Sequence, residues 1–282
     1  MPDFPILDTH LHLIAPDRLD YPWLSGAPKI NKPHSLADYD VATGAVDVDA
    51  MVFLEVDVNP ADALEEARYV TEQAERDPRI RAMVPFAPLE TGAAVADHLA
   101  ALAEFPLTRG VRRLLQGEAD PEFCLLPDFL AGVKALEAHD FSFDICVTYR
   151  QMASTVALAR ACPGVKMVLD HIGKPAIADG TMEPWASQIR ALAAEPNTWL
   201  KLSGVATEAD HDRWTREELK PFIVTAVEAF GIERTMFGGD WPVSTHAITY
   251  PEWVDVVEWA LALTPDESRQ LFRGTGEAFY RL

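Results

Sequence analysis

The stretch PILDTHLHLIAPDRLDYPWLSG, residues 5–26, separates two kinds of α/β fold. Its apolar first half predicts a β-strand over residues 5–13, and side chains two apart on a strand share a face. His10 and His12 are therefore expected on one side of the strand, together with Asp8. An open doubly wound sheet usually carries a phosphate loop, GxGxxG or GxxxxGK[ST], after its first strand. No such loop follows here, which counts against that fold.

Seven further apolar runs predict strands along the chain, and each is followed by a polar loop and then a helical pattern. The runs are nearly continuous in apolar residues, as expected of parallel strands that are buried on both faces. These predicted strands cover residues 50–58, 80–88, 108–115, 141–149, 165–173, 198–205 and 234–241. Eight strand–helix units in 282 residues predict an α/β protein, a single-domain (β/α)8 TIM barrel over residues 1–282.

Helix starts are marked by capping residues and apolar stripes. An Asn-Pro pair at 59–60 offers an N-cap and a first-turn proline. Residues 215–218 and 264–267 both match the capping box. Further helices are predicted over 93–103, around 129–136 and over 151–161.

The overall charge narrows the choice of partners. The net charge is −20, from 44 acidic and 24 basic residues, and such a field repels nucleic acid and anionic membrane surfaces. No apolar run approaches the roughly 20 residues of a membrane helix, and no signal peptide is recognisable. The three cysteines form no CxxC pair, which indicates reduced thiols in a cytoplasmic protein.

Unusual polar residues fall near the end of one predicted strand after another, where barrel enzymes carry their chemistry. A buried charge or imidazole is costly unless it is paired or used, so the recurrence points to a functional site. A structural role stays open for each: Arg112 could belong to an ion pair, His171 to the core and Asp240 to a turn. The residues are His10, His12, Glu55, Arg112, Arg113, Asp144, Asp170, His171 and Asp240.

Seven short motifs carry a family resemblance over essentially the whole chain. They are DTHLHL, VFLEVDV, GVRRLLQ, FSFD, LDHIGKP, KLSG and FGGDWP. Together they resemble the amidohydrolase superfamily, and within it the amidohydrolase 2 group of sugar-lactone and pyrone-dicarboxylate lactonases. GVRRLLQ and FSFD favour the sugar-lactonase side, with its L-fuconolactonase-like and L-rhamnonolactonase-like enzymes.

The resemblance implies hydrolysis of a small-molecule sugar lactone, L-fucono-lactone or a similar compound. Asp240 would act as general base and then acid, while His10, His12 and His171 polarise the carbonyl directly or through one metal ion. The same four residues would hold that ion, for which zinc is suited, although catalysis need not require it. Two-metal relatives need a lysine on the fourth strand and a histidine on the fifth. TRGVRRLL and FSFDICVTY contain neither, so a two-metal site is not expected.

Candidate substrate contacts come from aromatic and polar side chains near the same strand ends. Two tryptophans could stack on a sugar ring, and acids at two strand ends favour a neutral polyol lactone over a dicarboxylate. Two alternatives stay open: a metal-dependent decarboxylase of an aromatic acid on the same barrel, and a barrel that only binds a ligand. The predicted contacts are Trp23, Glu55, Arg112, Asp144, Tyr149, Lys174 and Trp241.

Overall fold

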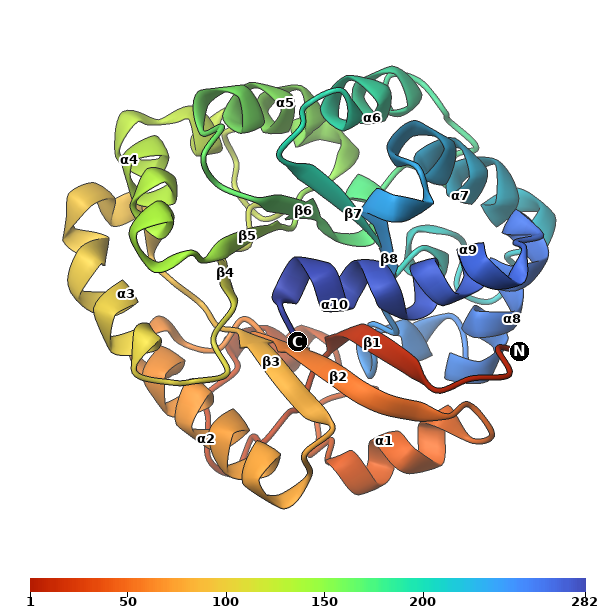
Figure 1. Cartoon of the computed structure of the whole chain (residues 1–282), viewed down its shortest axis with the longest axis horizontal. Coiled ribbons are helices and arrows are strands. Elements are labelled where there is room, and N and C mark those ends of the chain that lie inside the picture. The colour runs from red at the N-terminus through yellow and green to blue at the C-terminus, as the bar shows by residue number, and fades with distance from the viewer.

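The computed structural model describes residues 1–282, in which eight parallel strands alternate with helices (Figure 1). Every predicted strand is present, but each is shorter than its apolar run, because the run continues beyond the last ladder hydrogen bond into the loop that follows. The strands are β1 (Ile6–Leu11), β2 (Val48–Leu54), β3 (Ile80–Val84), β4 (Gly110–Arg112), β5 (Ser142–Ile145), β6 (Met167–Leu169), β7 (Thr198–Leu202) and β8 (Thr235–Phe237).

The helices confirm the capping boxes at Thr215 and Thr264. Two predicted starts are corrected. Asn59 caps a short 3-10 turn that precedes α2, and a kink at Gly92, with φ of 62°, delays the helix predicted from residue 93 until Ala96. The helices are α1 (Leu36–Thr43), α2 (Ala63–Arg76), α3 (Ala96–Ala103), α4 (Pro127–Ala135), α5 (Met152–Ala161), α6 (Trp185–Ala193), α7 (Arg216–Phe230), α8 (Tyr250–Leu261), α9 (Pro265–Arg269) and α10 (Thr275–Tyr280).

The strands pair in sequence order, as β1-β2-β3 in one sheet and β4-β5-β6-β7-β8 in another. Parallel bridges join the two sheets at both junctions: Met83 pairs with Thr108, and Leu11 pairs with Trp241. In an open doubly wound sheet, the last strand lies at an edge of the sheet. Here the segment that follows β8 instead pairs with β1, whose other neighbour is β2. Residues at the ends of the first and last strands are therefore neighbours.

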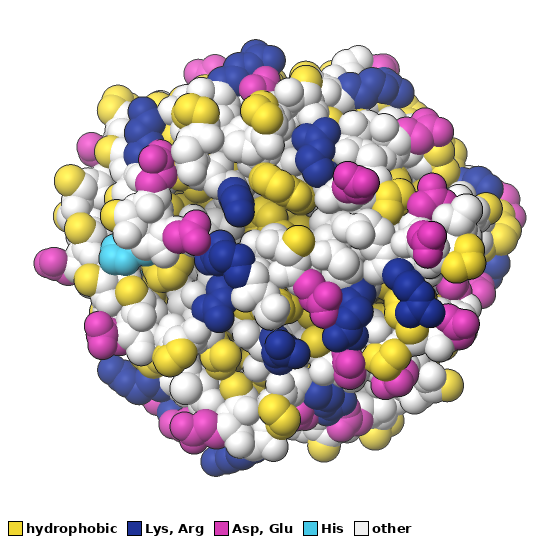
Figure 2. All heavy atoms as spheres, viewed as in Figure 1, with side chains coloured by type: hydrophobic (Ala, Val, Ile, Leu, Met, Phe, Trp, Pro, Cys, Tyr) yellow, Lys and Arg dark blue, Asp and Glu magenta, His cyan; other side chains and the backbone are white.

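Buried apolar side chains form two clusters, of which the smaller occupies the space among the strands. Its ten residues join side chains of β1, β2, β3, β6 and β8 to Phe279 and Tyr280 of α10. Figure 1 shows α10 crossing in front of the strands, so this helix covers one end of their arrangement. On the same face, Figure 2 shows Lys and Arg side chains near the centre, with acidic side chains among and around them.

None of the helices of this chain combines the length and the apolar character needed to span a membrane. Cys124, Cys146 and Cys162 are buried free thiols, as predicted from their number and spacing.

Candidate active site

The turn that follows β8 is fixed by a buried carboxylate on β1. Asp8 accepts a hydrogen bond from the Gly239 N–H at 2.8 Å and from the hydroxyls of Tyr39 and Tyr250 at 2.8 and 3.1 Å. Asp8 was expected beside the histidines. Its carboxylate instead holds the glycine turn that presents Asp240, whose backbone has a φ of 54°.

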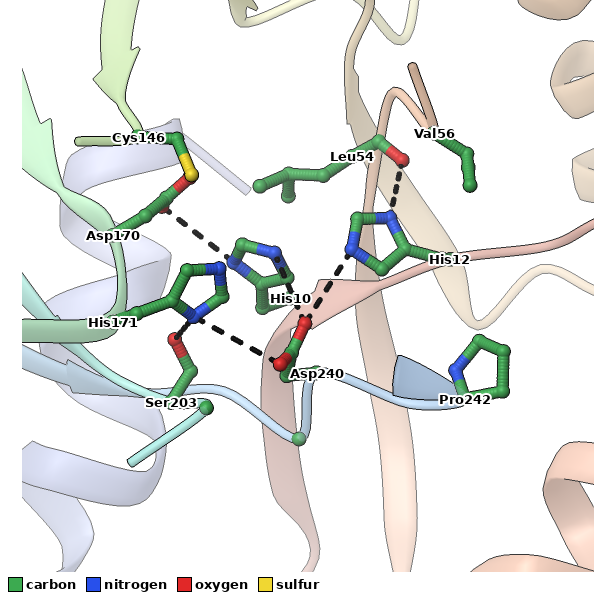
Figure 3. A network of polar contacts seen from close by, with 12 residues as sticks. His10, His12, Leu54, Val56, Cys146, Asp170, His171, Ser203, Asp240 and Pro242 are labelled. Carbon is green, nitrogen blue, oxygen red and sulfur yellow. Dashed lines mark hydrogen bonds and ion pairs between the residues drawn. The ribbon is translucent and has the colours of Figure 1, made fainter. Parts of the chain in front are cut away.

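Asp240 lies among three imidazoles (Figure 3). Its Oδ1 is 3.5 Å from His12 Nε2 and 3.7 Å from His10 Nε2, and its Oδ2 is 4.0 Å from His171 Nδ1. Burial alone would raise the pKa of Asp240, but His171, His12 and Lys174 outweigh it and leave the pKa below the ordinary 3.8. Asp240 is therefore an ionised carboxylate that can accept a proton.

His12 presents a lone pair to Asp240. Its Nδ1 lies 2.9 Å from the Leu54 carbonyl oxygen, which can only accept, so Nδ1 carries the proton in the neutral ring. Nε2 and the Asp240 carboxylate are then two acceptors facing each other, an arrangement that a cation or a proton between them stabilises. His10, His12 and Asp240 offer ligand atoms within 4.8 Å of one another, and nitrogen and oxygen donors of this kind suit Zn²⁺.

A second group, His10, Asp170 and His171, also has ligand atoms within 4.8 Å of one another, but it is less suited to a metal ion. Asp170 Oδ2 accepts a hydrogen bond from Arg112 Nη1 at 3.1 Å, and its Oδ1 is 3.3 Å from Lys201 Nζ. Two protein cations thus already neutralise this carboxylate. The residues around Asp240 are the better candidates for a single metal ion.

His10 is fully buried and is not among the residues that line the cavity beside Asp240. Arg112 Nη1 lies 3.3 Å from its Nε2, and Asp170 Oδ1 lies 3.5 Å from its Nδ1. Burial lowers the pKa of His10 well below its usual 6.5, and Lys201 and His12 lower it further. His10 is therefore a neutral ring packed beneath the site.

His171 depends on two residues of the KLSG motif that sequence analysis left without a role. Its Nδ1 is 3.0 Å from the Ser203 hydroxyl. Gly204 has a φ of +58°, and a Cβ there would come within 2.6 Å of His171 Nδ1 and 2.8 Å of Asp240 Oδ2. Only a glycine at position 204 therefore permits the close approach of the backbone to these two side chains.

Burial lowers the pKa of His171 well below 6.5, although Asp240 acts in the opposite direction.

These groups open into a cavity of about 180 Å³. Trp23 forms part of its wall and donates from Nε1 to the Val56 carbonyl at 2.8 Å. Six residues predicted from the sequence line this cavity: His12, Trp23, Arg112, His171, Lys174 and Asp240.

Glu55 and Asp144 are not among the lining residues, which corrects the expectation that they face substrate. Each is fully buried and paired: Glu55 Oε1 accepts from Arg112 Nε at 2.7 Å, and Asp144 Oδ2 accepts from Lys201 Nζ at 2.5 Å. The Tyr280 hydroxyl also donates to Asp144 Oδ2, at 2.6 Å. We call this set the buried charge network: Glu55, Arg112, Asp144, Asp170 and Lys201.

Tyr149 and Trp241 also lie outside the cavity. Tyr149 lines a separate groove beside Arg150, whose Nε is 3.3 Å from its hydroxyl. Trp241 is 3% exposed and packs edge-on against the rings of His34 and Tyr39. Neither aromatic ring reaches the space beside Asp240.

Several lining residues were not predicted. Asp57 stands two positions after Glu55, so a period-two pattern could have indicated it, and Gln116 ends the GVRRLLQ motif. Burial raises the pKa of Cys146 to about 12, so it lines the cavity as a neutral thiol. Nothing in the sequence distinguishes Thr207. The remaining lining residues are Val56, Leu114 and Val243.

Comparison with known proteins shows likeness over the whole chain. The family model described as amidohydrolase matches residues 7–282. An L-fucono-1,5-lactonase of Burkholderia ambifaria is 37% identical over 224 residues, which cover 77% of this chain and 76% of the relative. An L-fucono-1,5-lactonase of Burkholderia multivorans is 33% identical over 294 residues, which cover 98% of this chain and 96% of the relative.

A solved structure agrees with these matches. The crystal structure of an amidohydrolase from Burkholderia multivorans with bound zinc superposes with a TM-score of 0.88 at 32% identity. The superposition covers 99% of this chain and 100% of that chain.

Proposed function

This chain belongs to the amidohydrolase family, and from that premise we propose that it hydrolyses a sugar lactone to the open-chain sugar acid. The observation that carries the proposal is the position of Asp240, an ionised carboxylate between His12 and His171 at the wall of a cavity. Relatives named L-fucono-1,5-lactonase make that lactone, or a similar one, the first substrate to test.

We propose that residues 1–282 form a single-domain, closed (β/α)8 barrel. The parallel bridges at both junctions between the two sheets support closure. A closed ring brings the carboxyl ends of all eight strands to one rim, where barrel enzymes carry their active sites.

Asp240 is the proposed general base. As water attacks the lactone carbonyl carbon, Asp240 takes its proton, since the lowered pKa keeps this carboxylate ionised. The tetrahedral intermediate then collapses, the bond from the carbonyl carbon to the ring oxygen breaks, and that oxygen takes the proton back from Asp240. One group thus serves as base and then acid.

Negative charge that develops on the carbonyl oxygen is stabilised by the cationic and imidazole groups of the cavity. Arg112 is a permanent cation, and its partners in the buried charge network fix its orientation. Burial acts to lower the pKa of Lys174, but the carboxylates of Glu208 and Asp240 act in the opposite direction and the pKa lies above its usual value, so the ammonium stays charged. His171 lies beside Asp240 and is the imidazole assigned to the carbonyl.

His10, His12 and Asp240 are the residues that would hold one divalent ion. When bound, such an ion supplies Lewis-acid polarisation of the carbonyl. Arg112 and Lys174 provide positive charge at the same cavity from the protein itself, so we infer that hydrolysis does not require the ion. The decarboxylase alternative does require it.

For substrate binding, we propose that Trp23 packs on the apolar face of the sugar ring, with Arg112 and Lys174 on its oxygens. Glu55 and Asp144 act one layer below, where they hold Arg112 and Lys201. No substrate contact is assigned to Tyr149 or Trp241.

We propose that the enzyme works in the cytoplasm, on a small molecule and without a nucleic-acid or membrane partner. The three free buried thiols are typical of a reducing compartment. The net charge of −20 opposes contact with polyanions.

Proton release measured across a panel of aldonolactones, with and without a chelator, tests the proposal. We expect turnover of L-fucono-1,5-lactone or a stereoisomer, its retention after exhaustive chelation, and its loss in Asp240→Asn. Asp179→Asn, in an exposed loop, is the matched control and keeps full activity. An unreactive panel would remove sugar-lactone hydrolysis, and carbon dioxide release from an aromatic acid only with metal would favour the decarboxylase.

A further inference from the structure

Asp57 is a carboxylate in the cavity wall with no partner in the protein. Asp57 is exposed and lines the same cavity as Asp240, Arg112 and Lys174, and its carboxylate oxygens form neither an ion pair nor a hydrogen bond. The other acids nearby are engaged: Glu55 pairs with Arg112, and Asp240 lies among the imidazoles. Asp57 is thus available to a ligand.

The backbone around Asp57 is held by side chains from three directions. Glu55 Oε2 accepts the Asp57 N–H at 2.6 Å, and Glu66 Oε1, from α2, accepts the Val56 N–H at 3.2 Å. Trp23 Nε1 donates to the Val56 carbonyl at 2.8 Å. These contacts fix the direction in which the side chain of Asp57 leaves the chain.

Two features indicate that the fold maintains this backbone conformation at Asp57 through specific contacts. Asp57 has a φ of 51°, a left-handed conformation that is uncommon outside glycine, that Asp adopts more readily than most residues, and that recurs at functional sites. Glu55 and Glu66 are both fully buried, and buried acids are costly unless they serve a purpose. Here both hold the peptide groups on which the Asp57 side chain is mounted.

The chemistry of a free carboxylate matches a substrate rich in hydroxyls. A carboxylate accepts hydrogen bonds through both oxygens and donates none, while each ring hydroxyl of a sugar lactone can donate one. A substrate bearing its own carboxylate would be repelled at the same position.

We propose that Asp57 is the specificity-determining residue of this cavity: its carboxylate accepts hydrogen bonds from ring hydroxyls and so selects uncharged polyhydroxylated lactones over unsubstituted or carboxylated ones. The inference rests on the proposed lactonase function. Asp57 contacts the hydroxyl groups of the substrate and takes no part in the proton transfers assigned to Asp240.

The experiment compares two variants with a matched control. Asp57→Asn keeps the shape and tolerates the left-handed backbone, and Asp57→Gly removes the side chain without backbone strain. Asp140→Asn is the control, because Asp140 also has a positive φ, 52°, and lies outside the lining of the cavity. Each protein is assayed with L-fucono-1,5-lactone and with δ-valerolactone, and for inhibition by the corresponding hydroxylated and unsubstituted lactams, which need no turnover.

Loss of a hydrogen bond to a charged group predicts a fall of about tenfold to a hundredfold in kcat/KM for the hydroxylated lactone in both Asp57 variants. Binding of the hydroxylated lactam weakens by a similar factor, while values for the unsubstituted compounds and for Asp140→Asn stay within about twofold of the parent. Equal losses on both compound classes, or no loss, would overturn the role of Asp57 and leave the lactonase standing. A parent that hydrolyses no sugar lactone would overturn both proposals.

Discussion

Two polar regions lie one above the other in this fold, the cavity around Asp240 and the buried charge network below it. In the network every charge has an opposite charge beside it, as with Lys201 Nζ, which is 2.5 Å from Asp144 and 3.3 Å from Asp170. In the cavity, contacts are longer, and the distances from the Asp240 carboxylate oxygens to the nearest imidazole nitrogens are 3.5 to 4.0 Å. Completed pairing maintains structure, whereas incomplete pairing leaves groups free for a substrate.

Arg112 belongs to both regions. Its Nε and one Nη bind Glu55 and Asp170, and the same side chain reaches the cavity wall. The network therefore does more than satisfy its own charges, because it fixes a cation in the wall of the cavity, where the proposed hydrolysis would develop negative charge.

The largest expected effect comes from removing the base. Asp240→Asn should lower kcat by about 10²–10⁴-fold, the usual contribution of a general base, with little change in the unfolding free energy. In the parent, the pKa of Asp240 lies below 3.8, so kcat/KM should hold as pH falls until that value is passed. An active Asp240→Asn enzyme would contradict the assignment of the chemistry to the cavity and of a structural role to the buried charge network.

A pair of lysine variants sharpens the comparison. Lys201→Met leaves the buried carboxylate of Asp144 without a cation and removes one of the two cations beside Asp170, and chemical denaturation should show a loss of about 3–5 kcal/mol. Lys174→Met, in the cavity wall, should lower kcat/KM about tenfold and change the unfolding free energy by less than about 1 kcal/mol. If the two effects were exchanged, the assignment of the lysines would be wrong.

A pair of glycine variants separates crowding from backbone strain. Gly204 and Gly180 both have positive φ, +58° and +61°, but a Cβ meets His171 and Asp240 only at Gly204. Each alanine variant should destabilise by about 1–2 kcal/mol, and only Gly204→Ala should also lose about a hundredfold in kcat/KM. Similar kcat/KM values in the two variants would remove the steric argument.

The smallest effect concerns pH and stability. His10 and His171 have pKa values lowered by burial, so the folded protein keeps them neutral where the unfolded chain begins to protonate near 6.5. Their contribution to stability is present above that pH and is lost as pH falls, by up to about 1.4 kcal/mol per pH unit for each. Denaturation midpoints at pH 7.5 and 5.5 measure it, and His10→Asn should flatten the dependence.

The strand count and order were predictable because apolar runs and turn residues are local features. Strand ends were not, because a run such as VKMVLDHIG contains no glycine or proline before Gly173, whereas β6 ends at Leu169. A helix such as α1 was missed because its apolar residues form no stripe.

Within the site, the sequence indicated which residues cluster but not how deep each one lies. Glu55 and Asp144 are acids on or beside strands, as Asp240 is, and were therefore expected to face the substrate beside that general base. Their burial depends on cations from other strands, and Lys201 was hidden inside the apolar run TWLKL. Asp57 is an exposed acid in a loop, like many acids without a specific role, and only its position in the cavity wall distinguishes it.

The hydrogen bond from Gly239 to Asp8 joins residues 231 positions apart. During translation, His10 and His12 are synthesised within the first dozen residues, and Asp240 is added only after more than 200 further residues. The proposed site can therefore form only after the segment that follows β8 has packed against β1. Lactone turnover during refolding would then report on this long-range contact.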